Sequence, residues 1–137
     1  MESLLIARIA LGTAVTGLLI AFLLYRKVVG IRIENRVVAG ITQEIQDGAM
    51  AFLKAEYRVL AVFILVVAGL LAWALGIQTA IAFVFGAFSS VLAGFSGMKS
   101  ATSANGRTAV AAAEGGLPAA LETSYNGGAV MGLAVGG

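Results

Sequence analysis

The sequence predicts an all-α polytopic membrane protein, a bundle of transmembrane helices with three complete spans and the start of a fourth. Hydrophobic residues make up 60% of the chain and charged residues only 12%. The forty residues 59–98 include no Asp, Glu, Lys or Arg, and only the short stretch 76–79 interrupts them. A bilayer core about 30 Å thick needs roughly 20 apolar residues per helical crossing. Residues 59–76 and 79–98 therefore predict a membrane hairpin.

The first span is predicted at residues 4–25, where an uncharged run from Ile9 ends at Arg26 and Lys27. A cleaved signal peptide is the alternative for this segment. No basic cluster precedes Arg8, however, and no small-residue cleavage site follows Tyr25. We therefore expect a retained span.

The fourth span is predicted to start at residue 117, with Pro118 in its first turn, where the missing N–H has no helical partner. Its uncharged run begins at Thr123 and has only fifteen residues, which is short for a crossing. We expect residues 1–137 to be the N-terminal part of a single, longer membrane domain.

Basic residues indicate the orientation. The polar stretches 26–58 and 99–116 hold eight of the nine Lys and Arg residues, and Arg8 is the exception. Cytoplasmic segments of membrane proteins carry an excess of Lys and Arg. Both stretches are therefore predicted as cytoplasmic loops, with the N-terminus extracytoplasmic. Apolar residues at helical spacing within 41–53 predict an amphipathic helix that leads into the second span.

Small residues recur every fourth position in two of the predicted spans. Such stripes let helix backbones approach closely in lipid, where hydrophobic burial does not drive association. We predict helix-packing roles for Gly86, Ser90, Gly94, Gly128, Gly132 and Gly136.

The chain offers little catalytic chemistry. It has no His or Cys, a single Asp at position 47, and no Gly-rich phosphate loop followed by Lys-Ser or Lys-Thr. We therefore predict no catalytic, substrate-binding or metal-binding residue. Three polar residues are weaker candidates. Asn105 and Arg107 either line the mouth of a transport path or cap and anchor a helix, and Glu122 is either an ion-handling carboxylate or a partner of the helix dipole.

Three blocks of sequence resemble the N-terminal region of membrane-integral, ion-translocating inorganic pyrophosphatases, in order and in spacing. They are residues 45–57 (IQDGAMAFLKAEY), 94–109 (GFSGMKSATSANGRTA) and 127–132 (GGAVMG). The resemblance implies a parent enzyme that hydrolyses inorganic pyrophosphate on the cytoplasmic side and pumps H⁺ or Na⁺ outward. It also implies Mg²⁺ as cofactor and a homodimer. The Asp-rich motifs that hold pyrophosphate and metal in the family do not occur here.

Two other classes stay open on the residues alone. A proteolipid subunit of a rotary ATPase would use Glu122 as its ion carrier, and a secondary transporter would share the apolar spans. Every reading places the chain in a membrane, as a multi-pass protein in contact with the lipid bilayer. For a pyrophosphatase that membrane is a bacterial or archaeal inner membrane or that of an acidic organelle.

Overall fold

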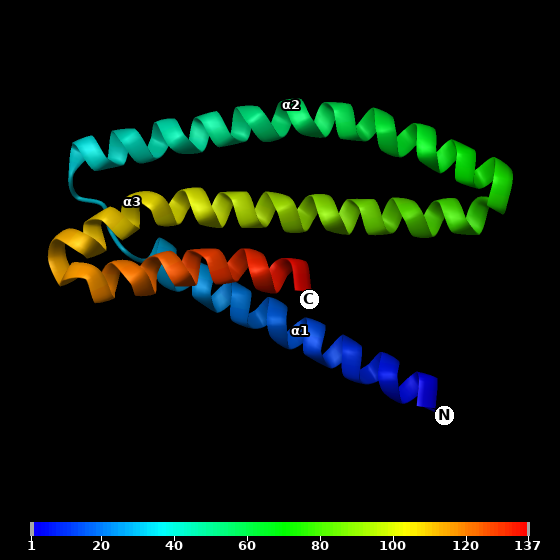
Figure 1. The fold of residues 1–137 in the computed structure, drawn as a ribbon, viewed down its shortest axis with the longest axis horizontal. Helices are drawn as coiled ribbons and strands as arrows, with labels where there is room; N and C mark the ends of the chain where they lie inside the picture. The colour runs from blue at the N-terminus through cyan, green and yellow to red at the C-terminus, as the bar shows by residue number, and fades with distance from the viewer. Residues whose placement is uncertain (1, 137) are drawn as a thin grey trace.

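The computed structural model describes residues 2–136, which fold into three helices (Figure 1). They are α1 (Glu2–Val29), α2 (Arg36–Leu75) and α3 (Ile77–Gly136). All three are long and apolar enough to cross a membrane. Helices α2 and α3 run antiparallel as a long hairpin, and α3 then bends back on itself, so that its last part lies against α1. The predicted all-α membrane class is confirmed.

The connection between α1 and α2 is short and is stabilised by local hydrogen bonds. The Gly30 amide donates to the Arg26 carbonyl at 3.0 Å, which closes the last turn of α1. Asn35 is the N-cap of α2, and its side-chain oxygen accepts hydrogen bonds from the amides of Val37 and Val38. Such a cap satisfies backbone donors that have no partner within the helix.

The predicted turn of the hairpin is tighter than expected. Only Gly76 separates the end of α2 at Leu75 from the start of α3 at Ile77. Gly76 has φ 93°, a conformation that a residue with a Cβ rarely adopts. A single glycine thus reverses the chain.

The long helix α3 consists of two limbs, residues 77–115 and 117–136, which we call the first limb and the second limb. Between them, Gly116 has φ 70° and ψ −164°. Pro118 lies in the first turn of the second limb, as predicted, where a missing N–H leaves no hydrogen bond unmade. The bend therefore depends on Gly116 for its unusual backbone angles. Pro118 suits the position at which the helix begins again after the bend.

The two polar stretches predicted as loops are largely helical. Helix α2 is continuous from Arg36 through the amphipathic segment and the second span. The first limb of α3 likewise continues beyond the third span to residue 115. Its Ala-rich sequence explains this continuation, because alanine has the highest helix propensity. Only residues 30–35 of the first polar stretch lie outside a helix.

Helix α3 packs against both other helices, whereas α1 and α2 do not pack on each other within residues 2–136. The buried residues are mostly small. The buried apolar and polar side chains are Ala21, Val28, Leu53, Ala80, Ala104, Ala120, Val130, Thr42, Ser100, Thr102, Ser103 and Thr123. A core of small residues is typical of helices that associate within lipid.

Two glycines mark the closest approaches between helices. A Cβ built at Gly106 would overlap the side chain of Thr42 on α2. One built at Gly127 on the second limb would overlap the Cβ of Ala104 on the first limb. These contacts fix how near α2 and the second limb come to the first limb.

The predicted small-residue stripes lie mostly on open surface in this part of the polypeptide. An added Cβ would meet nothing within 4 Å at Gly86, Gly128, Gly132 or Gly136, among the atoms that the structure describes. Ser90 is exposed, and a Cβ added at Gly94 would lie 3.4 Å from the Tyr57 hydroxyl oxygen. Within residues 2–136, the second limb makes close contacts at Gly127, one position before the predicted stripe, and at Met131, which lies against Gly97 of the first limb. Packing by the stripes stays a prediction.

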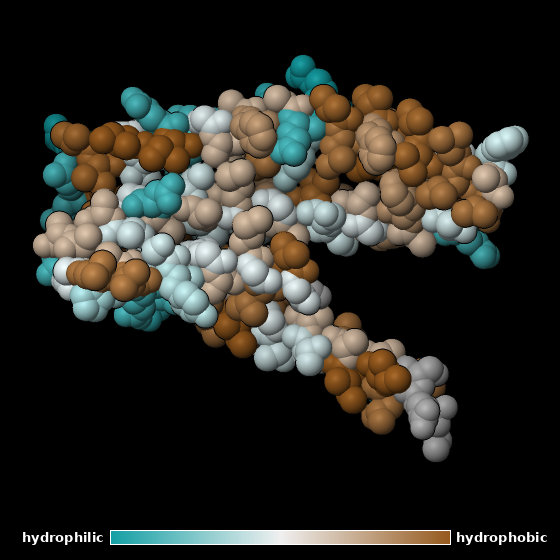
Figure 2. Space-filling view, viewed as in Figure 1, coloured by the Kyte–Doolittle hydropathy of each residue, from teal (hydrophilic) through white to brown (hydrophobic). Residues whose placement is uncertain are grey.

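The surface separates by polarity along the long axis. Hydrophobic residues dominate the half of the hairpin nearer its turn, and hydrophilic residues gather mainly toward the opposite end (Figure 2). Exposed apolar side chains include Leu65, Trp73 and Phe85 on the two long helices. Such a surface is unusual for a soluble protein and suits contact with lipid or further helices.

We predict that Gly127→Ala destabilises the full-length protein in detergent, whereas Gly48→Ala does not. The new methyl group at position 127 would overlap Ala104, and overpacking of this kind costs about 1 to 3 kcal/mol. Gly48 lies on α2, and an added Cβ there would meet no atom of residues 2–136 within 4 Å. Alanine there gains up to about 1 kcal/mol of helix propensity. Thermal unfolding of both variants provides the measurement.

A second substitution tests whether the loss arises from this contact. Ala104→Gly removes the methyl group that the new side chain would strike. The double variant should therefore recover much of the unfolding temperature lost by Gly127→Ala. If the double variant instead lost as much unfolding temperature as the two single variants together, the proposed contact would be contradicted.

Candidate functional site

The polar groups converge at one end of the molecule, which we call the polar end. It comprises residues 26–31 after the first span, 36–47 at the start of α2 and 99–123 around the bend of α3. Figure 1 shows these segments together at the end opposite the hairpin turn. The distribution of Lys and Arg predicts both polar stretches on one side of the membrane, and the structure brings them into contact.

Arg107 connects α3 to the end of α1. Its Nε donates to the Ile31 carbonyl at 3.1 Å, and its Nη2 donates to the Val29 carbonyl at 3.4 Å. Nη1 donates to the carbonyl of Ser103, one turn earlier on α3, at 2.8 Å. The last carbonyls of a helix lack partners within it, and a positive charge is favourable there. Arg107 therefore acts as a cap for α1, supplied from α3.

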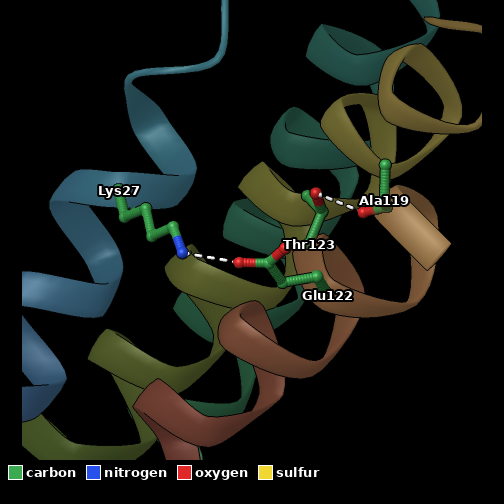
Figure 3. Close-up of polar contacts among 4 residues, drawn as sticks. All are labelled: Lys27, Ala119, Glu122 and Thr123. Carbon is green, nitrogen blue, oxygen red and sulfur yellow. Dashed lines mark hydrogen bonds and ion pairs between the residues drawn. The ribbon is translucent and has the colours of Figure 1, made fainter. Parts of the chain in front are cut away.

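Lys27 and Glu122 form an ion pair between α1 and the second limb (Figure 3). The distance from Lys27 Nζ to Glu122 Oε1 is 2.6 Å, and both side chains are more than 60% exposed. Exposed ion pairs contribute little to stability. The pair therefore contributes little to holding the two helices together.

An open cleft of about 370 Å³ surrounds this ion pair. Glu114, Glu122, Lys27 and Asn126 line it, together with Thr123. The Thr123 hydroxyl donates to the Ala119 carbonyl of its own helix at 2.9 Å, so it points away from Lys27 (Figure 3). Within residues 2–136, no group of three or more His, Cys, Asp or Glu side chains comes together. The cleft therefore does not fit a Mg²⁺ site, which usually recruits carboxylates together with bound phosphates.

Further hydrogen bonds join α2 and the second limb of α3 to the first limb. The buried Ser100 hydroxyl donates to the Gly127 carbonyl at 3.1 Å, and Gln46 on α2 donates to the Ser103 hydroxyl at 3.3 Å. Nearer the hairpin turn, the Tyr57 hydroxyl donates to the Val91 carbonyl at 3.1 Å. The polar residues of this region thus mostly make structural contacts.

The three candidate polar residues have different surroundings in the structure. Asn105 is exposed, and its side chain has no hydrogen bond to any residue that the structure describes. Arg107 does cap a helix, although the helix is α1 rather than its own. Glu122 lies beyond the first turn of the second limb and pairs with Lys27 instead of the helix N-terminus.

Several residues that hold this end together are not among the predicted site residues. In the sequence, Lys27 is only a charge that flanks the first span, and Thr42, Ser100 and Ser103 are not predicted as contact residues. Hydroxyl residues within an Ala-rich helix were a usable signal, because small polar side chains often pack between helices in membranes. The partner of Lys27 had no such signal, since Glu122 lies 95 positions away.

Comparison with known proteins gives a consistent assignment. The model of the family described as inorganic H⁺ pyrophosphatase matches residues 15–137. A Clostridium tetani protein with the provisional name of a K(+)-stimulated pyrophosphate-energized sodium pump is 43% identical over 133 residues. That alignment covers 97% of this chain and 19% of the relative.

Two further relatives carry names for different ions. The K(+)-insensitive pyrophosphate-energized proton pump 2 of Moorella thermoacetica is 49% identical, over 69% of this chain and 14% of its own length. The K(+)-stimulated pyrophosphate-energized sodium pump of Thermotoga maritima is 44% identical, over 71% of this chain and 14% of its own length. The chain thus spans less than a fifth of each of these relatives. With nearly its whole length matched, the chain belongs to the inorganic H⁺ pyrophosphatase family.

Proposed function

We propose that this chain is the N-terminal portion of a pyrophosphate-energised ion pump. The complete protein couples hydrolysis of inorganic pyrophosphate in the cytoplasm to outward translocation of H⁺ or Na⁺. The family match over residues 15–137 carries this proposal. The pump names of the relatives and three helices able to cross a membrane support it.

Within that pump, these residues serve as a scaffold at the polar end. The contacts of Arg107, Ser100 and Gln46 hold three helices in a defined arrangement. The reacting groups lie elsewhere in the polypeptide, because residues 2–136 bring together no cluster that suits a metal and pyrophosphate. We extend the proposal to Mg²⁺ as cofactor and to a homodimer, with ligands and contacts outside the scaffold.

The rotary ATPase alternative gains no support from the geometry. An ion carrier in such a subunit sits within the membrane and must lose and regain its ion. Glu122 instead lies at the polar end, is largely exposed and is paired with Lys27. We therefore do not assign ion transport to Glu122.

The main test uses the complete gene. Inverted membrane vesicles containing the full-length protein should release phosphate from Mg²⁺-pyrophosphate and take up H⁺ or Na⁺. Residues 1–137 expressed alone in the same membranes should release none above background, because the described residues 2–136 bring together no cluster that suits several metal ions. Turnover by residues 1–137 that depends on one of their own side chains would contradict this scaffold role.

A matched pair of variants tests the role of the ion pair. Glu122→Gln and Lys27→Gln in the full-length protein each remove one partner of the same contact. We expect both to keep the ratio of ions transported to pyrophosphate hydrolysed within about twofold of the parent, because exposed ion pairs contribute little. Selective loss of transport in Glu122→Gln, with hydrolysis intact, would instead identify Glu122 as an ion carrier.

Orientation is tested by cysteine labelling. We propose an extracytoplasmic N-terminus and a cytoplasmic polar end, which follows from the distribution of Lys and Arg. In a cysteine-free background, Glu34→Cys between α1 and α2 should be protected from an impermeant thiol reagent in intact cells. Gln78→Cys at the hairpin turn should be labelled. The opposite pattern would reverse the assignment.

A further inference from the structure

A second cleft lies where α1 meets both limbs of α3. Its volume is about 330 Å³. Apolar side chains from α1 and the first limb form much of its wall, notably Leu18, Phe22 and Phe95. Tyr25, Ser96 and Lys99 line the same cleft. The cleft therefore combines an apolar surface with hydrogen-bond donors and a cation.

The three polar side chains of this cleft have no partner within the described part of the chain. No side-chain hydrogen bond of Tyr25, Ser96 or Lys99 occurs among residues 2–136. The ion pair in that region joins Lys27 to Glu122 and does not involve Lys99. Among residues 2–136, no acidic side chain lines this cleft, in contrast to the one around Glu122. Within this part of the polypeptide, the charge of the cleft is therefore positive and uncompensated.

The position of the cleft along the helices matches the boundary of a membrane. Tyr25 ends the first predicted span, and Lys99 directly follows the third. Tyrosine is enriched at membrane interfaces, and lysine there keeps its ammonium group among the lipid headgroups. Leu18 and Phe22 lie one to two turns deeper along α1, at the level of the acyl chains.

We propose that this cleft binds an anionic phospholipid. An acyl chain packs against Leu18, Phe22 and Phe95, while Lys99 binds the phosphate and the hydroxyls of Tyr25 and Ser96 donate to its oxygens. The two parts of such a lipid match the two parts of the cleft in polarity and in charge. A neutral peptide segment would leave the ammonium group of Lys99 unpaired. The inference requires insertion in a membrane but not pyrophosphatase activity.

Lipid titration of the full-length protein tests the charge. The protein is delipidated in detergent, and bound phosphatidylglycerol is counted by native mass spectrometry. Lys99→Gln should weaken binding about fivefold, the effect of one basic residue near an anionic surface. Lys54→Gln is the control, because Lys54 is exposed on α2 outside the cleft. Equal affinities for phosphatidylglycerol and phosphatidylcholine, or equal losses in both variants, would overturn the proposal.

Cross-linking identifies what occupies the cleft. A photoreactive benzoylphenylalanine replaces Phe22 in the full-length protein, which is then illuminated in membranes that contain phosphatidylglycerol. The expected product is this residue joined to phosphatidylglycerol, with a lower yield when Lys99→Gln is added. A product joined to a later segment of the same polypeptide would show that protein covers the cleft and would refute lipid binding.

Discussion

The close approach of small residues along α3 is the constraint on which this structure depends. In lipid, apolar side chains gain little by leaving their surroundings, so helices associate through backbone proximity and a few hydrogen bonds. Here Gly106 allows Thr42 of α2 to lie against the first limb, and Gly127 allows the second limb to lie against Ala104. Because α1 and α2 share no interface within residues 2–136, α3 alone relates them to each other.

The polar end follows from this arrangement. Once the first limb extends past the third span, its hydroxyl and guanidinium groups reach three other segments. Arg107 uses one side chain to satisfy carbonyls of α1 and of α3. The ion pair between Lys27 and Glu122 adds an exposed contact between α1 and the second limb. The result is a corner at which hydrogen bonds hold α1, α2 and both limbs of α3 together.

Hydropathy and local backbone chemistry made much of the fold predictable. The spans follow from uncharged runs, the hairpin turn from the stretch that contains Gly76, and the start of the second limb from Pro118. Packing was harder to predict. Spacing identified a stripe through Gly128 whose packing stays a prediction, and it did not reveal the close contacts within residues 2–136 at Gly127 and Met131, because a repeat of small residues does not show which face meets a partner. The pairing of Lys27 with Glu122 depends on the bend at Gly116, whose geometry no local pattern specifies.

The turn at Gly76 also bears on how the protein reaches its membrane. With one residue between α2 and α3, the end of one helix cannot cross the bilayer while the start of the other stays behind. Both ends must therefore lie on the same side of the bilayer, along with the few polar groups of Gln78 and Thr79. We expect the α2–α3 hairpin to insert as a single unit, and its turn offers almost no loop for proteases or soluble partners to contact.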